Sequence, residues 1–148
     1  MGQLKIDSLP PGQVLALDTV TLIYFLERHP VYYPIVRELF KSIEENRFSA
    51  VISSLAFTEL LVPAFRAGKA EEATKLQKVL TNFPHLETVP LTVTIAAEAA
   101  RLRADYGIRT PDAIHLATAI KNEAAGFITN DKKLQRLQNE LSVWLIGG

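Results

Sequence analysis

Cysteine is absent from this chain of 148 residues. Without cysteine the protein has no disulfide bonds, no thiolate ligands for zinc and no thiol nucleophile, and it is compatible with a reducing compartment. The sequence also lacks any apolar run that approaches the roughly 18 residues of a membrane span, and it begins without the apolar segment of a signal peptide. These absences predict a cytoplasmic protein that does not associate with a membrane.

An excess of charge of either sign is lacking as well. Sixteen Lys and Arg residues balance sixteen Asp and Glu residues, so the formal net charge is zero. Nonspecific affinity for nucleic acids comes mainly from the neutralisation of phosphates, and this balance therefore weighs against a bulk nucleic-acid binder. It still allows an enzyme that holds a nucleic acid through a few local basic residues.

No internal repeat, low-complexity stretch or Gly/Ser linker divides the chain, and its length fits one domain. Short apolar runs alternate with helical patterns, which is typical of parallel strands separated by helices. The expected strands are 14–17, 48–52, 86–89, 126–129 and 142–146. The pattern predicts an α/β fold over residues 14–148, with one parallel sheet of about five strands flanked by helices. Residues 1–13 are expected to form an N-terminal extension outside the sheet.

Helix signals lie between these strands. The expected helices are 19–27, 31–46, 54–67, 69–83, 92–106, 110–123 and 131–138. Pro63 predicts a kink within the third of them, because proline removes a helical hydrogen bond. Thr92 can cap the start of the fifth helix and Gly107 can end it.

Four acidic residues lie at positions that matter for such a fold. Asp18 and Asp131 each follow an expected strand, Asp112 lies in a first helical turn, and Glu59 lies within a helix. Open α/β sheets bind ligands beyond the carboxyl ends of their strands. Several carboxylates around one crevice would hold Mg²⁺ or Mn²⁺, which prefer oxygen ligands, and such ions can activate water for phosphodiester cleavage.

Each acid also has a purely structural interpretation. Asp18 and Asp131 can cap the helices that follow them. Asp112 in a first turn is favoured by the helix dipole, and an exposed Glu59 on a helix is commonplace. Helix capping alone therefore does not decide whether the four acids form a site.

Four segments of the sequence resemble the PIN-domain family, and they occur in the family's order between residues 14 and 144. They are LALDT at 15–19, SSLAFTEL at 53–60, TPDAIHLATA at 110–119 and FITNDKKL at 127–134. The resemblance implies that the strands form a parallel sheet and that one acid from each segment enters a common pocket binding Mg²⁺ or Mn²⁺. These catalytic and metal-binding acids are Asp18, Glu59, Asp112 and Asp131. The resemblance further implies endonucleolytic cleavage of RNA, with Thr129 and Thr19 supporting the pocket by hydrogen bonds.

A short chain with no second domain resembles the toxin half of a VapBC-type toxin–antitoxin pair. That likeness implies an RNA substrate, an antitoxin partner and a homodimer. The sequence departs from the family at Val20, because many members carry Asn or Ser two positions after the first acid. The alternative is therefore a catalytically silent PIN-like module that acts by binding RNA or protein, although all four acids are present. A DNA substrate also stays open.

Basic residues next to the third and fourth acids are candidate contacts for RNA phosphates. They are Arg109, Lys132, Lys133 and Arg136. A solvent-exposed helix face is the equally simple interpretation of the last three. His115 lies one turn after Asp112, but it is expected to be a packed or surface histidine, since hard cations held by carboxylates do not need imidazole.

Three other enzyme classes lack a required feature here. A Rossmann dehydrogenase needs a glycine-rich turn after the first strand, and residues 18–21 contain no glycine. A phosphatase of the haloacid-dehalogenase type needs a second Asp at position 20, where Val stands. A phosphorelay receiver needs paired acids at the end of the first strand, and only Asp18 is present there.

Overall fold

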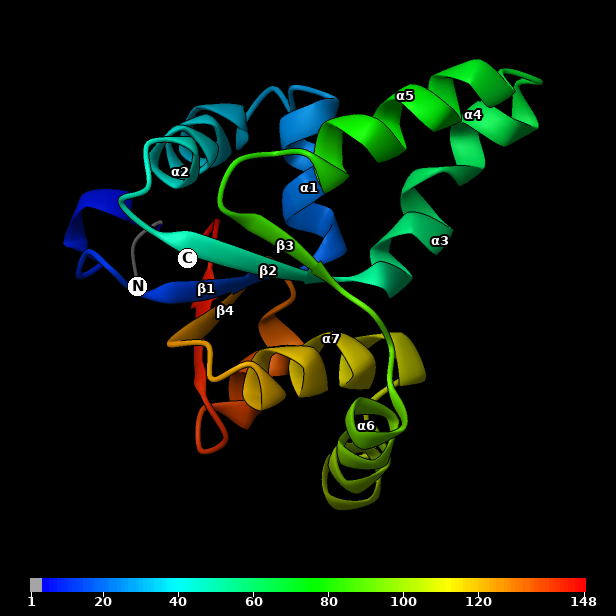
Figure 1. The fold of residues 1–148 in the computed structure, drawn as a ribbon. Coiled ribbons are helices and arrows are strands. Elements are labelled where there is room, and N and C mark those ends of the chain that lie inside the picture. The colour runs from blue at the N-terminus through cyan, green and yellow to red at the C-terminus, as the bar shows by residue number, and fades with distance from the viewer. Residues whose placement is uncertain (1–3) are drawn as a thin grey trace.

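A five-stranded sheet forms the centre of the computed structural model, which describes residues 4–148 (Figure 1). All its strand pairs are parallel, and their order across the sheet is β3-β2-β1-β4-β5. The strands are β1 (Val14–Leu17), β2 (Ser49–Ser53), β3 (Leu86–Val89), β4 (Gly126–Thr129) and β5 (Ser142–Leu145). The predicted fold class, an α/β domain with one parallel sheet of five strands, is confirmed.

Helices cover both faces of the sheet. The described residues form seven α-helices: α1 (Thr19–Leu26), α2 (Tyr33–Glu44), α3 (Phe57–Leu60), α4 (Val62–Arg66), α5 (Ala70–Thr81), α6 (Val93–Tyr106) and α7 (Thr110–Lys121). Three 3₁₀ helices accompany them: η1 (Ile6–Ser8), η2 (Ser54–Ala56) and η3 (Lys132–Leu137). Helices α1, α2 and α5 lie on one side of the sheet in Figure 1, and α6 and α7 lie on the other.

The strands divide their side chains between the two faces, because successive residues of a strand point in opposite directions. Leu15 and Leu17 pack with α1 and α2, whereas Ala16 between them packs with α6 and α7. On β4 the same alternation separates Phe127 from Ile128. The sheet is thus buried on both sides, which explains why its strands are almost wholly apolar.

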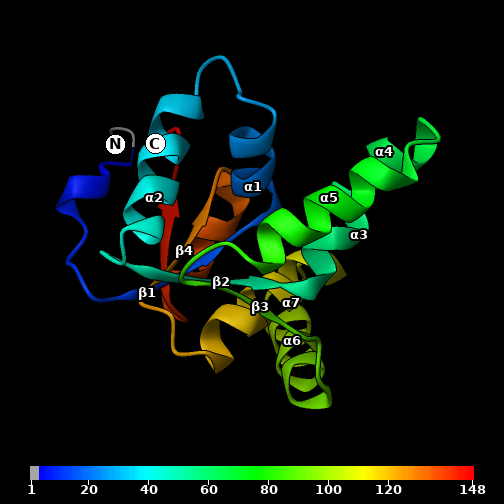
Figure 2. The same cartoon turned by 45° about the horizontal axis from the view of Figure 1, so that its top comes forward.

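The predicted helix over residues 54–67 is the least accurate of the expected elements. The structure has η2, α3 and α4 there, with the break at Leu61 between α3 and α4. Pro63 lies in the first turn of α4, where proline is tolerated, whereas a continuous helix would have needed its missing N–H. Together with α5 these short helices project to one side of the sheet (Figure 2).

Helix α6, which precedes the segment 110–119, begins and ends at the residues that the sequence predicts. The hydroxyl of Thr92 accepts a hydrogen bond from the N–H of Ile95 at 3.3 Å and caps the start of α6. Gly107 ends α6 with a positive φ of 64°, a conformation that glycine adopts at little cost. The next helix, α7, begins three residues later at Thr110.

The N-terminal segment lies outside the sheet but contributes to the core. Ile6 and Leu9 are buried against α2 and the strands. Residues 1–3 of the predicted extension lie outside the described residues, and the division of the chain at residue 14 stays a prediction. Within residues 4–148, no helix combines the length and the apolarity that crossing a membrane requires.

Candidate active site

The strand order creates a crevice at the carboxyl end of the sheet. The chain leaves β1 toward β2 on one side and leaves β4 toward β5 on the other, although β1 and β4 are neighbours. In doubly wound sheets, ligands bind at such a switch point, because the two departing connections leave room between them. Asp18 directly follows β1, and Asp131 lies two residues beyond β4.

Asp18 is fixed at this crevice by hydrogen bonds to both of its oxygens. Its Oδ1 accepts the N–H of Thr19 at 2.7 Å, which caps α1. Its Oδ2 accepts the hydroxyl of Thr129 at 2.7 Å, so the end of β4 holds the acid that follows β1. The helix-cap interpretation of Asp18 and the site interpretation are therefore compatible in the same residue.

Burial raises the pKa of Asp18, and the nearby carboxylate of Asp112 raises it further. The hydrogen bond from Thr129 is the largest opposing influence, followed by His115 and the N–H of Thr19. A buried carboxylate that lies near a second one gains stability from a cation. This environment is what a cation-binding carboxylate requires.

The hydroxyl of Thr129 also reaches the fourth acid segment. It accepts the backbone N–H of Asp131 at 3.2 Å while donating to Asp18. The side chain of Asp131 then accepts the N–H of Lys133 at 3.0 Å and caps η3. One buried threonine thus sets the relative positions of two of the four acids.

Asp112 lies in the first turn of α7, on the other side of the crevice. Its Oδ2 accepts a hydrogen bond from Nε of Arg109 at 3.3 Å, three residues earlier. The Arg109 side chain is 78% exposed and that of Asp112 is 15% exposed, so the guanidinium group is free to exchange this partner for another anion. Glu59 comes from α3 and is exposed.

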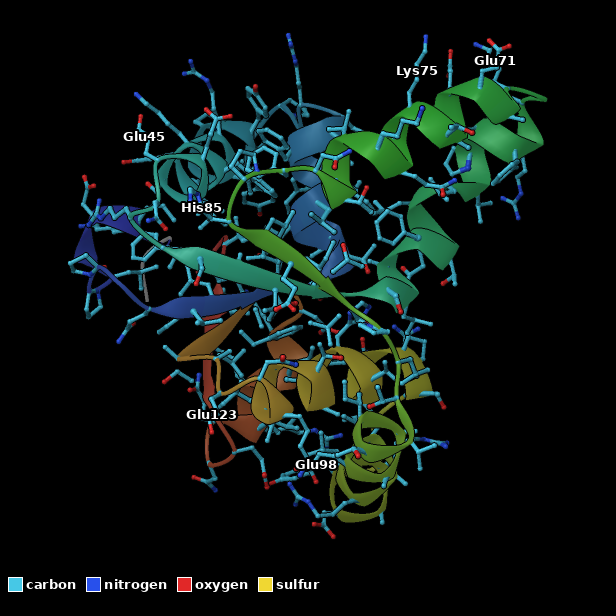
Figure 3. All side chains as sticks on the ribbon, in the orientation of Figure 1. Glu45, Glu71, Lys75, His85, Glu98 and Glu123 are labelled. Atoms are coloured by element: carbon cyan, nitrogen blue, oxygen red, sulfur yellow. The ribbon has the colours of Figure 1, made fainter. Side chains whose placement is uncertain are left out.

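All four predicted acids line one cavity of about 580 Å³, here called the acidic cavity. Arg109, His115 and Val20 also line it. Other acids lie elsewhere: Figure 3 shows the labelled side chains of Glu45, Glu71 and Glu123 at the periphery of the molecule. The structure therefore brings together the set that the sequence analysis assigned to one pocket.

The donors fit a hard divalent cation by their chemistry, because they are carboxylate oxygens at a partly buried site. They do not form a closed set of ligands: within residues 4–148, no three His, Asp or Glu side chains are grouped so as to hold a metal ion. Glu59 and the Arg109–Asp112 pair line the cavity from different helices. Metal binding would therefore require these side chains to rearrange.

His115 is a packed histidine, and it contacts the acid segments through Thr19. Its Nε2 lies 3.0 Å from the Thr19 hydroxyl, and both residues are buried. Its Nδ1 is buried without a hydrogen-bond partner among the described residues. This pair joins the first turn of α1 to α7 and so links the segment of Asp18 to that of Asp112.

We expect Thr19→Val to lower the free energy of unfolding by about 1–3 kcal/mol, because it leaves the buried imidazole of His115 without a partner. The double variant Thr19→Val/His115→Leu should recover most of that loss, since both polar groups are then gone. Urea titrations of wild type, Thr19→Val, His115→Leu and the double variant measure the cycle. Additive losses in the double variant would show that the two side chains do not act as a pair.

Three polar residues of the acidic cavity were not assigned a role from the sequence, namely Tyr24, Thr58 and Asn130. The side-chain amide of Asn130 donates to the hydroxyl of Tyr24 at 3.0 Å, and its oxygen accepts the N–H of Gly147 at 2.9 Å. Tyr24, like Asn130, lines this cavity. The sequence could have pointed to Asn130 through its position between Thr129 and Asp131, two residues that were assigned to the pocket.

Of the four predicted RNA contacts, three line one cavity and one does not. Arg109, Lys133 and Arg136 line a second cavity of about 390 Å³, here called the basic cavity. Asp112 and Asp131 belong to both cavities. Lys132 lines neither of them.

Comparisons with known proteins identify the family of this chain and its fold. The model of the family described as the PIN domain matches residues 15–140. No curated protein sequence matches the chain. Among solved structures, VapBC2 from Rickettsia felis bound to promoter DNA has 22% identity and a TM-score of 0.67, covering 88% of this chain and 96% of that one. VapBC-1 from nontypeable Haemophilus influenzae has 22% identity and a TM-score of 0.67, covering 89% and 97%.

A third similar structure is VapBC-5 from Mycobacterium tuberculosis, a member of the VapBC family of toxin–antitoxin systems. It has 23% identity and a TM-score of 0.55, and the match covers 94% of this chain and 100% of that one. Identities this low show a shared fold. The family match, in contrast, spans all four acid segments.

Proposed function

Since this chain belongs to the PIN-domain family, we propose that it is a metal-dependent endoribonuclease whose reaction takes place in the acidic cavity. The single observation that carries the proposal is the convergence of Asp18, Glu59, Asp112 and Asp131 on that cavity at the switch point of the sheet. Mg²⁺ or Mn²⁺ bound by these acids would activate a water molecule and stabilise charge on the phosphodiester oxygens.

The chain's own residues orient the acids and the substrate. Thr129 and the N–H of Thr19 hold the Asp18 carboxylate in one orientation, which lowers the cost of arranging it for reaction. The exposed guanidinium group of Arg109 beside Asp112 offers a bidentate donor for a phosphate. The acids repel the substrate phosphate on their own, so cation binding and Arg109 together would offset that repulsion.

The structural neighbours support a role as the toxin of a toxin–antitoxin pair. The similar structures from Rickettsia felis and Mycobacterium tuberculosis are VapBC assemblies. We therefore propose an antitoxin protein as partner and a homodimer as the assembly. RNA is the proposed substrate, and the same cleavage assay on a matching DNA strand tests that choice.

One observation favours the second candidate function, a catalytically silent binding module. Val20 lines the acidic cavity, and it is the position at which the sequence departs from the Asn or Ser of the family that it resembles. An apolar group there removes one hydrogen-bonding partner for water or substrate. The cleavage experiment separates the two functions.

The test is cleavage of a mixed RNA pool by the purified protein with Mn²⁺ or Mg²⁺, beside a chelated sample and Asp112→Asn. That substitution keeps the side-chain shape and removes its charge. Glu71→Gln on α5, at the periphery in Figure 3, is the matched control. We expect cleavage by wild type and Glu71→Gln alone, and only with metal. Equal cleavage by Asp112→Asn would place the activity outside this site, and inactivity of all samples would favour the silent module.

A further inference from the structure

The basic cavity shares a wall with the acidic cavity. Arg109, Asp112 and Asp131 line both cavities, whereas Lys133 and Arg136 line only the basic one. The basic cavity lies between the turn from α6 to α7 and η3. An RNA strand that occupies the acidic cavity can therefore continue directly into the basic cavity.

The sign of the charge changes across this wall. Four carboxylates and one guanidinium group line the acidic cavity, whereas three cationic side chains and the two shared carboxylates line the basic one. The chain as a whole has no net charge, whereas the side chains that line the basic cavity carry more positive than negative groups. An opening lined by Arg and Lys suits a phosphate oxygen, which accepts charge-assisted hydrogen bonds.

Hydrogen bonds fix two of the residues that line the basic cavity, Arg136 and Lys133. The guanidinium group of Arg136 donates to the backbone carbonyl of Tyr106, the last residue of α6. The backbone N–H of Lys133 donates to the side chain of Asp131. Buried Leu134 anchors η3 between these two positions. The cavity is thus organised before a ligand arrives.

We propose that the basic cavity is a subsite for the RNA phosphate next to the one that is cleaved. This inference rests on the proposed ribonuclease function and adds to it the path of the substrate strand. Lys133 and Arg136 supply the positive charge of the subsite, and Arg109 spans the wall between the two phosphates. The subsite recognises the phosphate backbone and therefore binds RNA irrespective of base sequence.

Adjacent lysines provide a matched pair of variants. Lys132 and Lys133 are both exposed residues of η3, but only Lys133 lines the basic cavity. Lys133→Ala and Lys132→Ala remove the same charge from neighbouring positions. A difference between them therefore measures the subsite rather than the net charge of the protein.

The first measurement is the salt dependence of RNA binding and cleavage. For a single-stranded RNA with one cleavage site, we expect Lys133→Ala to lower kcat/KM about fivefold at low salt through a higher KM, as expected for one exposed charge contact. The slope of log affinity against log salt should fall by about 0.7, the value for one lost phosphate contact on a single strand. Lys132→Ala should change both quantities less. Equal effects of the two substitutions would overturn the subsite.

The second measurement removes the charge from the RNA instead. Single uncharged methylphosphonate linkages are placed in turn at each position around the cleavage site. A methylphosphonate at one position beside that site should weaken RNA binding by wild type as much as Lys133→Ala does. The same linkage should not weaken RNA binding by Lys133→Ala any further. Additive effects at every position would contradict the assignment.

Binding assays keep this inference separate from the proposed catalysis. Binding of the same RNA to Asp112→Asn and to Asp112→Asn/Lys133→Ala is measured by titration. A parallel titration uses an acidic peptide in place of the RNA. A Lys133-dependent salt slope without cleavage by wild type would support the subsite and contradict the nuclease. Cleavage by wild type with no Lys133 dependence would support the nuclease and contradict the subsite. A Lys133 effect seen only with the acidic peptide would likewise overturn the RNA assignment.

Discussion

Asp18→Asn is expected to lower kcat/KM for RNA cleavage by at least about 100-fold while making the metal-free protein more stable. The loss follows because mutation even of an outer partner of a metal ligand costs about 10- to 100-fold, and Asp18 is a proposed ligand. The gain follows because burial raises the pKa of this carboxylate, so its ionised form is costly in the folded state. Activity and stability should therefore change in opposite directions.

The stability difference should depend on pH with a defined sign. The folded-state pKa of Asp18 lies above the ordinary aspartate value of 3.8, so the folded protein binds this proton more tightly than the unfolded chain does. Wild type should lose the corresponding stability as the pH rises from 3.8 through the folded-state pKa. Asp18→Asn carries no such proton, so its advantage should grow over that interval and then stay constant.

Thermal melts in chelator at several pH values check both statements. We expect Asp18→Asn to melt a few degrees above wild type at neutral pH. The Asn side chain keeps an oxygen for the N–H of Thr19, so the cap of α1 persists. Its amide nitrogen can only donate to the Thr129 oxygen, so the bond to β4 reverses direction and the buried Thr129 hydroxyl loses its acceptor. We expect this loss to be smaller than the gain from removing the buried charge. Glu71→Gln is the control for losing an exposed charge. A less stable Asp18→Asn at neutral pH, or one that cuts RNA normally, would contradict the role assigned to this carboxylate.

Much of the fold was predictable because its signals are local. Apolar runs between turn residues marked the strands, and Thr92 and Gly107 marked both ends of α6. Two acids could be placed as well, because the carboxyl ends of parallel strands share one edge of the sheet. Their positions needed no knowledge of how distant segments pack.

The other two acids could be assigned only through the family resemblance. Glu59 and Asp112 enter the cavity from helices, and no local pattern states that α3 and α7 face the same crevice. The chain also forms two separate helices with a break at Leu61, whereas the sequence predicted one helix with a kink at Pro63. Their convergence is a product of tertiary packing.

Contacts between distant segments were not predictable from the sequence. Thr19 and His115 are 96 positions apart, and Asp18 and Thr129 are 111 apart. The first contact was not anticipated, and the second was anticipated only as a supporting role within the family. Similarly, the sequence could not distinguish Lys132 from Lys133, because a short 3₁₀ helix turns neighbouring side chains in different directions.

Mn²⁺ should raise the melting temperature of wild type, since a ligand that binds only the folded state stabilises it by mass action. At a concentration of about 100 times Kd the gain is about 2.7 kcal/mol, which corresponds to roughly 5–10 °C for a domain of this size. The carboxylates lining the acidic cavity repel one another, and a divalent cation offsets that repulsion. Differential scanning fluorimetry against Mn²⁺ concentration measures the shift.

Variants show whether the shift comes from the acidic cavity. Asp131→Asn and Asp112→Asn should move the Mn²⁺ dependence to higher concentrations, whereas Glu71→Gln should follow wild type. A shift in wild type together with absent RNA cleavage would assign the chain to the silent-module function, because the site would bind metal without using it. A melting temperature that does not change with Mn²⁺ or Mg²⁺ at several pH values would contradict the metal site, because it would show that neither ion binds to the folded protein.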